Sequence, residues 1–598
     1  MREFSLPALY EVPADGNLTD IVRRNAAQHP DVAVIARKTD AGWQDVTAEA
    51  FLTEVRTAAK GLIASGVQPG DRVGLMSRTR YEWTLLDFAI WSAGAVTVPV
   101  YETSSPEQVQ WILSDSGATA CVVEQDGHAA TVEAVRERLP ALKHVWQIDA
   151  GGVAELGRLG RDLTDATVEE RSSLAKADDT ATIIYTSGTT GRPKGCVLTH
   201  RAFFAECGNI VERLRPLFRT GECSVLLFLP LAHVFGRLVQ IAPMMAPIKL
   251  GNLPDVKHLT EELAAFRPTL ILGVPRVFEK VYNAARAKAQ ADGKGKIFDK
   301  AADTAIAYSK ALDTPSGPSL GLRIKHRVFD RLVYGKLRAV LGGRGEYAIS
   351  GGAPLGERLG HFFRGIGFTV LEGYGLTESC AATAFNPWDR QKIGTVGQPL
   401  PGSVIRIADD GEVLLHGDHL FKEYWNNEAA TAEALADGWF HTGDVGTLDE
   451  DGYLRITGRK KEIIVTAGGK NVAPAVIEDR VRAHALVAEC IVVGDGRPFV
   501  AALITLDEEF LGRWAAEHGK PSGATAASLR EDPELLAAIQ GAVDDGNAVV
   551  SKAESVRKFR VLGGQFTEES GHLTPSLKLK RNAVAKDFAA DIEALYQK

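Results

Sequence analysis

The sequence of 598 residues lacks a long apolar run and an excess of basic charge. No window approaches about 18 consecutive apolar residues, so we expect no membrane-spanning helix. It has 68 lysines and arginines against 76 acidic residues, and the resulting net charge of -8 argues against a general nucleic-acid binder. The N-terminal stretch MREFSLPALYEVPADG also lacks the apolar core of a signal peptide. These absences favour a cytoplasmic protein that does not bind nucleic acid.

Cysteines are few and scattered. None forms a C-x-x-C pair, and none stands at metal-ligand spacing from a histidine. We therefore expect buried, reduced thiols and no metal site built from thiolates. The six positions are Cys121, Cys196, Cys207, Cys223, Cys380 and Cys490.

The order of apolar and polar segments predicts the fold class. Short apolar runs such as RVGLM, AVTVPVY and TIIYT alternate with longer amphipathic segments such as RAFFAECGNIVERL, in which Phe203, Cys207 and Ile210 recur at helical spacing. This alternation predicts an α/β protein with layers of helices on largely buried strands. The chain is too long for one hydrophobic core, so we expect at least two domains.

A domain boundary is predicted near the stretch DGYLRITGRKKEIIV. Beyond it, AECIVVGDGRPFVAALITLD resembles two strands joined through Gly494-Asp495-Gly496, and charged helical segments follow. We therefore predict a large N-terminal α/β domain over 1–459 and a smaller α+β domain over 460–598. The junction is the basic run 459–461 rather than a Pro/Ser linker, which indicates a hinge near Lys461. A solvated strand edge is the alternative interpretation.

The first candidate site is the stretch YTSGTTGRPKG, residues 185–195. It places hydroxyls, glycines and one lysine directly after an apolar strand, so that backbone N–H groups and a mobile positive charge can surround an anion. It is not a Walker A loop, because glycine rather than serine or threonine follows the lysine. We interpret it as a phosphate-binding loop, with a generic turn as the alternative. Its candidate residues are Thr186, Ser187, Gly188, Thr189, Thr190 and Lys194.

The second candidate is the stretch GYGLTES, residues 373–379. Tyr374 stands between glycines, so its ring can lie flat on a base without interference from neighbouring side chains. Thr377 and Glu378 then place a hydroxyl and a carboxylate beside it, which suit a phosphate and Mg²⁺ respectively. The upstream stretch ISGGAPL supplies another glycine-lined backbone edge at Gly351 and Gly352. A simple turn at the end of a strand is the alternative.

Two further segments carry charged candidates. Asp444, in DGWFHTGDVG, is a carboxylate on a tight turn that can accept hydrogen bonds from ribose hydroxyls, and Arg459 follows fifteen residues later. The C-terminal stretch HLTPSLKLKRNAV contains Lys578 and Lys580, for which a basic surface tail is the alternative interpretation.

These four segments, in this order, resemble the adenylate-forming (ANL) superfamily over nearly the whole chain. FLPLAHVFGR (228–237), GVPRVFEK (273–280) and GRKKEIIVTAGGKNVAP (458–474) resemble its long-chain fatty-acyl-CoA synthetases. The resemblance implies the ANL fold, with a mobile C-terminal domain. It also implies activation of a long-chain fatty acid by ATP and Mg²⁺ to an acyl-adenylate, followed by thioester formation with CoA. A fatty acyl-AMP ligase that loads a carrier protein, and a medium-chain or aryl CoA ligase, are the alternatives.

The resemblance also implies roles for individual residues. Tyr374 stacks on adenine with Gly351, Gly352 and Gly375 nearby, and Thr377 contacts the α-phosphate. Glu378 and Thr186 hold Mg²⁺, while Asp444 and Arg459 bind the ribose. His233 lines the acyl pocket, Lys578 bridges the substrate carboxylate and ATP, and Gly468 and Gly469 line the pantetheine channel after rotation about Lys461.

Two positions depart from the pattern of many relatives. Leu577 stands where they have glycine, which leaves Lys580 as a second candidate for the catalytic lysine, and the hinge residue is lysine rather than aspartate. The sequence leaves the oligomeric state open between monomer and homodimer. The basic stretch RIKHRVFDRLVYGKLR, residues 323–338, suggests peripheral contact with a membrane, with a solvated helix face as the alternative.

Overall fold

The computed structural model describes residues 1–186, 192–574 and 578–597. Residue contacts divide the chain into two compact units. Unit 1 comprises Met1–Arg406, Leu414–His441 and Leu448–Leu454, and unit 2 comprises Ile407–Val413, Thr442–Thr447 and Arg455–Lys598. The two short segments of unit 2, 407–413 and 442–447, are joined to each other by a backbone hydrogen bond, in which the N–H of Gly446 donates to the carbonyl of Gly411 at 3.0 Å. The predicted division after residue 459 stays a prediction.

One sheet of unit 1 has the strand order β16-β15-β14-β13-β12-β10-β11-β2-β3. Its central strands are parallel and buried, as expected for continuous apolar runs with helices on both faces. The register places Gly273 opposite Ser350, and Ser350 opposite Glu372, so β12 and β13 end together and β14 extends two residues further, to Tyr374. The bounds are β2 (Ala33–Thr39), β3 (Gly42–Thr47), β10 (Ser224–Leu227), β11 (Lys249–Asn252), β12 (Leu270–Gly273), β13 (Tyr347–Ser350), β14 (Thr369–Tyr374), β15 (Ala384–Phe385) and β16 (Gln398–Pro399).

The second sheet of unit 1 has the order β19-β9-β8-β5-β4-β6-β7. Its strands β8 and β9 are antiparallel and flank the predicted phosphate loop, with Thr186 directly opposite Lys194. The bounds are β4 (Arg72–Met76), β5 (Val96–Val100), β6 (Ala120–Val123), β7 (His144–Gln147), β8 (Thr180–Thr186), β9 (Lys194–Thr199) and β19 (Glu423–Tyr424).

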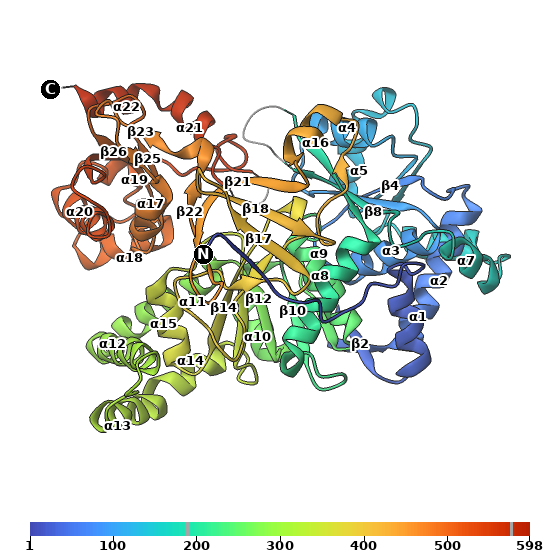
Figure 1. Cartoon of the computed structure of the whole chain (residues 1–598), viewed down its shortest axis with the longest axis horizontal. Helices are drawn as coiled ribbons and strands as arrows, with labels where there is room; N and C mark the ends of the chain where they lie inside the picture. The colour runs from blue at the N-terminus through green and yellow to red at the C-terminus, as the bar shows by residue number, and fades with distance from the viewer. Residues whose placement is uncertain (187–191, 575–577, 598) are drawn as a thin grey trace. The chain divides into compact units, whose positions relative to one another are not determined.

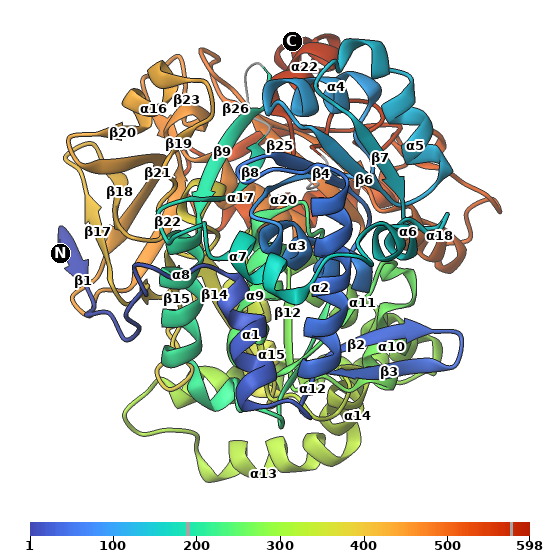
Figure 2. The same cartoon turned by 90° about the vertical axis from the view of Figure 1, so that its right-hand side faces the viewer.

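Helices pack against both sheets (Figure 1). Figure 2 shows α2 and α3 running beside each other next to β2 and β4. The helices of unit 1 are α1 (Thr19–Gln28), α2 (Ala48–Ala64), α3 (Tyr81–Ser92), α4 (Pro106–Asp115), α5 (Asp126–Glu133), α6 (Gly152–Leu159), α7 (Asp165–Ser172), α8 (His200–Arg213), α9 (Val234–Met245), α10 (Leu259–Phe266), α11 (Pro275–Ala291), α12 (Gly295–Leu312), α13 (Leu320–Phe329), the π-helix η4 (Asp330–Tyr334), α14 (Gly335–Val340), α15 (Glu357–Gly365) and α16 (Glu428–Ala434). In the described part of the chain, no helix is long and apolar enough to cross a membrane.

A buried ion pair fixes α9 against α3. The guanidinium of Arg237 contacts the carboxylate of Asp87 at 2.9 Å, and both side chains are 0% exposed. Gln240 donates to the same carboxylate at 2.7 Å, and the rings of Trp83 and Trp91 surround the guanidinium. Removing one partner would leave an uncompensated buried charge, so the pair defines where α9 lies.

Further strands lie between residues 403 and 459. N-terminal strand β1 (Glu3–Ser5) pairs antiparallel with β17, where Glu3 faces Arg406. The other bounds are β17 (Ser403–Ile407), β18 (Glu412–Gly417), β20 (Leu435–Ala436), β21 (Trp439–Leu448) and β22 (Leu454–Arg459).

Unit 2 contains a sheet in the order β25-β26-β27, with helices on both faces. Alternate residues of β26 point to opposite faces, as the period of a strand requires. Ile504 packs with Ile477 and Ile539 of α17 and α20, whereas Leu503 packs with Val584 of α21. The bounds are β23 (Ile464–Val465), β24 (Asn471–Val472), α17 (Pro474–Arg482), β25 (Val487–Val493), β26 (Val500–Leu506), α18 (Glu508–Glu517), α19 (Ala526–Leu529), α20 (Pro533–Asn547), β27 (Val556–Val561), α21 (Arg581–Asp587) and α22 (Ala589–Tyr596). The predicted combination of a large α/β part and a smaller α+β part is confirmed.

Candidate active site

The parallel strands β12, β13 and β14 end side by side and bring two predicted segments together. Gly351 follows β13, and its N–H donates to the carbonyl of Gly273 at 3.2 Å. Gly352 has a φ of +84°, a left-handed conformation that favours glycine. Tyr374 ends the neighbouring strand β14. Ligands of open parallel sheets bind beyond the carboxyl ends of the strands, so this edge is where a bound molecule is expected.

The turn after Tyr374 is compact and requires a glycine. A Cβ on Gly375 would lie 1.9 Å from the carbonyl oxygen of Ala381, a separation that no side chain tolerates. Thr377–Ser379 form a single 3-10 turn, and the N–H of Leu376 donates to the hydroxyl of Ser379 at 2.9 Å. Thr377 and Glu378 are thereby held directly beyond the strand end.

A buried carboxyl group on α8, that of Glu206, contacts the backbone of this turn. The N–H of Ala382 donates to Oε1 of Glu206, whose side chain is fully buried. Burial raises the pKa of the Glu206 carboxyl well above its ordinary value. The residues between this anchor and the 3-10 turn are strained, because Cys380 has a φ of +59° and Ala381 a φ of +118°. Glu206 therefore stabilises a strained segment that carries Glu378.

Glu378 also belongs to a contact chain with Tyr424 and Lys194. The hydroxyl of Tyr424 donates to Oε1 of Glu378 at 2.6 Å. The ammonium of Lys194 lies 4.7 Å from the centre of the Tyr424 ring, within the range of a cation–π contact. Burial and the negative charge of Glu378 raise the pKa of Tyr424, so its hydroxyl stays protonated. Tyr424 therefore contacts both the carboxylate of Glu378 and the ammonium of Lys194, which come from distant segments of the sequence.

Both ends of the predicted phosphate loop are held by contacts close to Tyr424 and Lys194. Thr186 pairs with Lys194 across β8 and β9. At the other end, the indole N–H of Trp111 donates to the carbonyl of Pro193 at 2.9 Å, and Arg192 lies 4.7 Å over the same indole ring. The predicted residues Ser187, Gly188, Thr189 and Thr190 lie outside the described residues.

His233 forms the start of α9. Its Nδ1 accepts a hydrogen bond from the N–H of Phe235 at 3.1 Å, so the neutral ring carries its proton on Nε2. The Phe235 ring would lie 3.5 Å from a Cβ on Gly351, which places the start of α9 against the end of β13. His233 is half-buried. The predicted pocket residue is thus held at the same strand edge by α9 and its buried Arg237.

Within unit 2, Asp444 and Arg459 form an ion pair. Nε of Arg459 lies 2.8 Å from Oδ1 of Asp444, which is 3% exposed. The next residue, Lys460, contacts Asp410 at 2.6 Å and Glu412 at 2.9 Å. The two residues that the sequence proposed for one ribose therefore lie together, while their role stays a prediction.

The remaining predicted residues of unit 2 lie on exposed turns. Lys461 is in a 3-10 turn, and Gly468 and Gly469 form the turn between β23 and β24. Lys578 has an exposed side chain, and its backbone N–H donates to the hydroxyl of Thr574 at 3.0 Å. Lys580 directly precedes α21 and is less exposed. The roles of these residues stay predictions.

The structure adds Tyr424 and Glu206 to the predicted site residues. Nothing in the spacing of Tyr424 relates it to Glu378, so sequence reasoning had no signal for it. Glu206 did leave a signal, because it stands three residues after Phe203 and four before Ile210, on the apolar side of α8. A charged residue at such a position needs a buried partner.

The oxygen atoms of Glu378 and Thr186 suit a metal ion that is also bound by the phosphates of a nucleotide. Among the described residues, no group of three or more histidines, cysteines and carboxylates is arranged to hold a metal by itself. Mg²⁺ in phosphate-transfer enzymes is commonly held by one or two carboxylates and by the phosphates of the substrate. One carboxylate, Glu378, with the hydroxyl of Thr186, matches that pattern.

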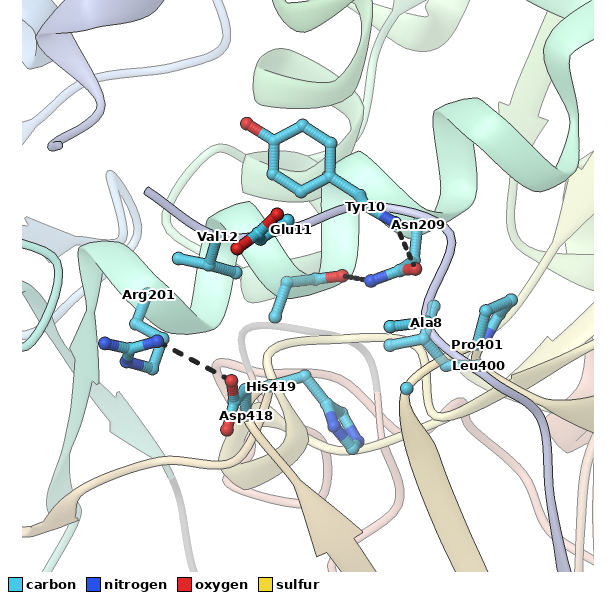
Figure 3. A pocket seen from close by; sticks show the side chains of 12 residues that line it. Ala8, Tyr10, Glu11, Val12, Arg201, Asn209, Leu400, Pro401, Asp418 and His419 are labelled. Carbon is cyan, nitrogen blue, oxygen red and sulfur yellow. Dashed lines mark hydrogen bonds and ion pairs between the residues drawn. The ribbon is translucent and has the colours of Figure 1, made fainter. Parts of the chain in front are cut away.

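A separate hollow of about 290 Å³ lies under the N-terminal segment (Figure 3). Asn209 accepts hydrogen bonds from the N–H groups of Leu9 and Tyr10 at 2.7 and 3.1 Å, and Arg201 faces Asp418 at 3.6 Å. Burial lowers the pKa of His419, another lining residue, to about 3. None of the predicted site residues that the structure describes lines this hollow.

Comparisons with known proteins agree along the whole chain. The model of the AMP-binding enzyme family matches residues 22–425, and that of the AMP-binding enzyme C-terminal domain matches residues 461–598. The chain is 52% identical over 601 residues to the long-chain-fatty-acid–CoA ligase FadD15 of Mycobacterium bovis, covering 100% of both. It is 31% identical to the long-chain-fatty-acid–CoA ligase ACSBG2 of Xenopus laevis, covering 95% of this chain and 82% of the relative.

Solved structures support the fold. The A domain of carboxylic acid reductase from Segniliparus rugosus has a TM-score of 0.73 at 19% identity, covering 98% of this chain and 94% of that one. The anthranilate CoA ligase AuaEII has a TM-score of 0.69 at 20% identity, covering 97% and 99%. With the family models and the full-length relatives, these findings confirm the predicted resemblance: the chain belongs to the AMP-binding, adenylate-forming enzyme family.

Proposed function

We propose that this chain is an AMP-forming ligase that joins long-chain fatty acids to CoA at the expense of ATP. The identity of 52% to a ligase of that name, over the full length of both chains, supports the substrates. The observation that carries the chemistry is the chain of contacts from Glu378 through Tyr424 to Lys194, beside the ends of the phosphate loop.

In the first half-reaction, a carboxylate oxygen of the acid attacks the α-phosphorus of ATP. The bond from the α-phosphorus to the bridging oxygen breaks, and pyrophosphate leaves with the electron pair. Two anions must approach each other, so the site needs positive charge and donors where charge accumulates. We assign this work to Lys194, Thr186 and the N–H groups of the loop. Glu378 and Thr186 would hold Mg²⁺, which when bound would neutralise part of the charge of the phosphates.

Residues of several predicted segments orient the nucleotide. We assign adenine to the face of Tyr374, the α-phosphate to Thr377, and the ribose hydroxyls to Asp444 and Arg459. Arg459 lies 2.8 Å from the carboxylate of Asp444, whose oxygens are acceptors for hydrogen bonds from hydroxyl groups. Gly351, Gly352 and Gly375 leave room at the edge of the base.

In the second half-reaction, the thiolate of CoA attacks the acyl carbonyl carbon, and AMP leaves with the oxygen that joined it to the acyl group. We assign Lys578 to the first half-reaction only. Rotation about Lys461 then withdraws its charge and presents the turn of Gly468 and Gly469 to pantetheine. For the acyl chain, each methylene buried beyond His233 contributes about 0.8 kcal/mol.

The test is pyrophosphate release with ATP, Mg²⁺ and saturated acids of increasing length, each with and without CoA. We expect release to rise with chain length and CoA to drive turnover to acyl-CoA. A maximum at medium-chain or aryl acids would reassign the substrate. Release that CoA leaves unchanged, with accumulated adenylate, would favour a ligase that loads a carrier protein.

A matched pair of variants tests the catalytic lysine. We expect Lys578→Gln to lose adenylation while it still converts supplied acyl-adenylate and CoA to acyl-CoA. Lys580→Gln, two residues away, is the control and should retain both half-reactions. Loss of adenylation in Lys580→Gln alone would move the assignment to that lysine.

The cellular setting belongs to the same proposal. We place the enzyme in the cytoplasm, where ATP and CoA are present, with peripheral contact to a membrane that holds its substrate. Sedimentation of the purified chain decides between monomer and homodimer.

A further inference from the structure

Helix α13 presents a stripe of aliphatic side chains to solvent. Leu320, Ile324, Val328 and Leu332 recur every four residues, and residues at this spacing lie on one face of a helix. They are 76%, 58%, 50% and 56% exposed. Other exposed aliphatic side chains are distributed over several elements, whereas these four follow one another along α13 and η4. Contiguous exposed apolar surface marks a contact site.

The opposite face of α13 already makes the contacts that hold the helix in unit 1. The ring of His326 stacks on Tyr308 at 3.9 Å, and its Nε2 lies 2.6 Å from the carbonyl oxygen of Gly365. Figures 1 and 2 both show α13 at the lower edge of the picture, beyond α14. The aliphatic stripe is therefore a second apolar face, which packing within the unit does not use.

Basic side chains flank the stripe. Residues 320–340 contain six lysines and arginines and one acidic residue, in a chain whose net charge is -8. The acidic residue, Asp330, pairs with Arg338 at 2.7 Å. Five basic side chains are exposed and, among the described residues, none of the five lies within ion-pair distance of a carboxylate. These are Arg323, Lys325, Arg327, Arg331 and Lys336.

We propose that α13 and η4 dock this protein on an anionic lipid bilayer, with Leu320, Ile324, Val328 and Leu332 inserted among the acyl chains. An amphipathic helix with aliphatic residues on one face and basic residues beside them lies in the plane of a membrane interface. The basic side chains favour a lipid bilayer over a second copy of the chain as the partner, because two copies facing each other through α13 would bring like charges together. The anionic headgroups of a bilayer instead complement these basic side chains.

The dimensions agree with surface binding. α13 has 10 residues and a length of about 15 Å, half the thickness of the hydrocarbon core of a bilayer. It lies along the interface without crossing it. The inference rests on the membrane contact of the proposed function and names the surface that makes it, but it does not depend on the ligase activity.

The experiment is flotation of the full chain with vesicles of phosphatidylcholine alone or mixed with phosphatidylglycerol, without substrate. We expect co-migration with the anionic vesicles at low salt and loss of binding as salt is raised. Ile324→Gln/Leu332→Gln should weaken partitioning roughly tenfold or more, because two inserted aliphatic side chains become polar. Lys325→Gln/Arg331→Gln should weaken it about 25-fold, since each charge near an anionic surface contributes about fivefold.

Matched controls come from exposed residues elsewhere in the chain. Leu174 and Val549 are 54% and 50% exposed, so Leu174→Gln/Val549→Gln removes similar apolar surface away from α13 and should bind as the wild type does. Ligase activity on detergent-dispersed acid is measured in parallel and is expected to be unchanged in every variant, which keeps failure of this inference separate from failure of the proposed function.

Three results would overturn the inference. One is no co-migration of the wild type with anionic vesicles at low salt. Another is equal binding by the wild type and the two α13 variants. The third is a concentration-dependent dimer that Ile324→Gln/Leu332→Gln abolishes, since the stripe would then bind a second copy.

Discussion

The buried carboxyl group of Glu206 yields a prediction with two separable parts. Its Oε1 accepts the N–H of Ala382, and its burial raises its pKa above the ordinary value of 4.5. Glu206→Gln keeps an oxygen that can accept this hydrogen bond and removes the ionisable group. Glu206→Ala removes both. The two variants therefore separate the effect of the charge from the effect of the contact.

The sign of the pH effect follows from proton binding. Between the ordinary pKa and the raised pKa, the folded protein holds a proton that the unfolded chain has lost, so stability falls as the pH rises through this window. The slope is about 1.4 kcal/mol per pH unit, which corresponds to a shift on the order of 1–3 °C in melting temperature. Glu206→Gln lacks this slope and should therefore gain stability over the wild type as the pH rises from 5 to 8.

The loss of the contact has a different signature. Glu206→Ala leaves the N–H of Ala382 without its buried acceptor, at a cost of about 1–3 kcal/mol. The strained turn at Cys380 and Ala381 then relaxes and displaces Glu378. We expect pyrophosphate release by Glu206→Ala to fall at least tenfold. Glu206→Gln should retain most of the wild-type rate, because a positioning role requires only the hydrogen-bond acceptor.

The assays are melting temperature at four pH values and pyrophosphate release for the same variants. Glu212→Gln, on a half-exposed carboxylate of the same helix, is the control and should change neither. A wild-type activity in Glu206→Ala, or the same pH slope in Glu206→Gln and the wild type, would refute the reasoning.

Three further predictions concern the turn and its partners. Gly375→Ala places a Cβ 1.9 Å from the carbonyl of Ala381, so it should abolish ATP–pyrophosphate exchange; exchange within twofold of the wild type would show that the turn opens freely. Tyr424→Phe keeps the ring under Lys194 but removes the hydrogen bond of 2.6 Å to Glu378. A hydrogen bond to a charged group contributes about 1.5–3 kcal/mol, so exchange should slow by roughly 10- to 100-fold, and an unchanged rate would remove Tyr424 from the site. Asp444→Asn weakens the pairing with Arg459, and we expect KM for ATP to rise about tenfold with unchanged far-UV circular dichroism; an unchanged KM would argue against the ribose assignment.

The sequence alone was sufficient for the fold class and the family. Apolar runs of strand length alternate with helical patterns, and this alternation depends only on local periodicity, which each segment carries by itself. The motifs were readable for a related reason, since the phosphate loop and the GYGLTES turn each keep their chemical groups within a few residues. Asp444 and Arg459 were also proposed together, and they form an ion pair.

Only the tertiary structure decided which distant residues support these motifs and which face of α13 packs against the rest of its unit. Ala382 and Glu206 are 176 positions apart, and Tyr424 and Glu378 are 46 apart, so no local pattern relates them. In α13, both faces carry apolar residues, and periodicity cannot say which of two such faces a neighbour covers. The contacts of His326 cover one face and leave the aliphatic stripe outside, because burial depends on where the other elements of the unit lie.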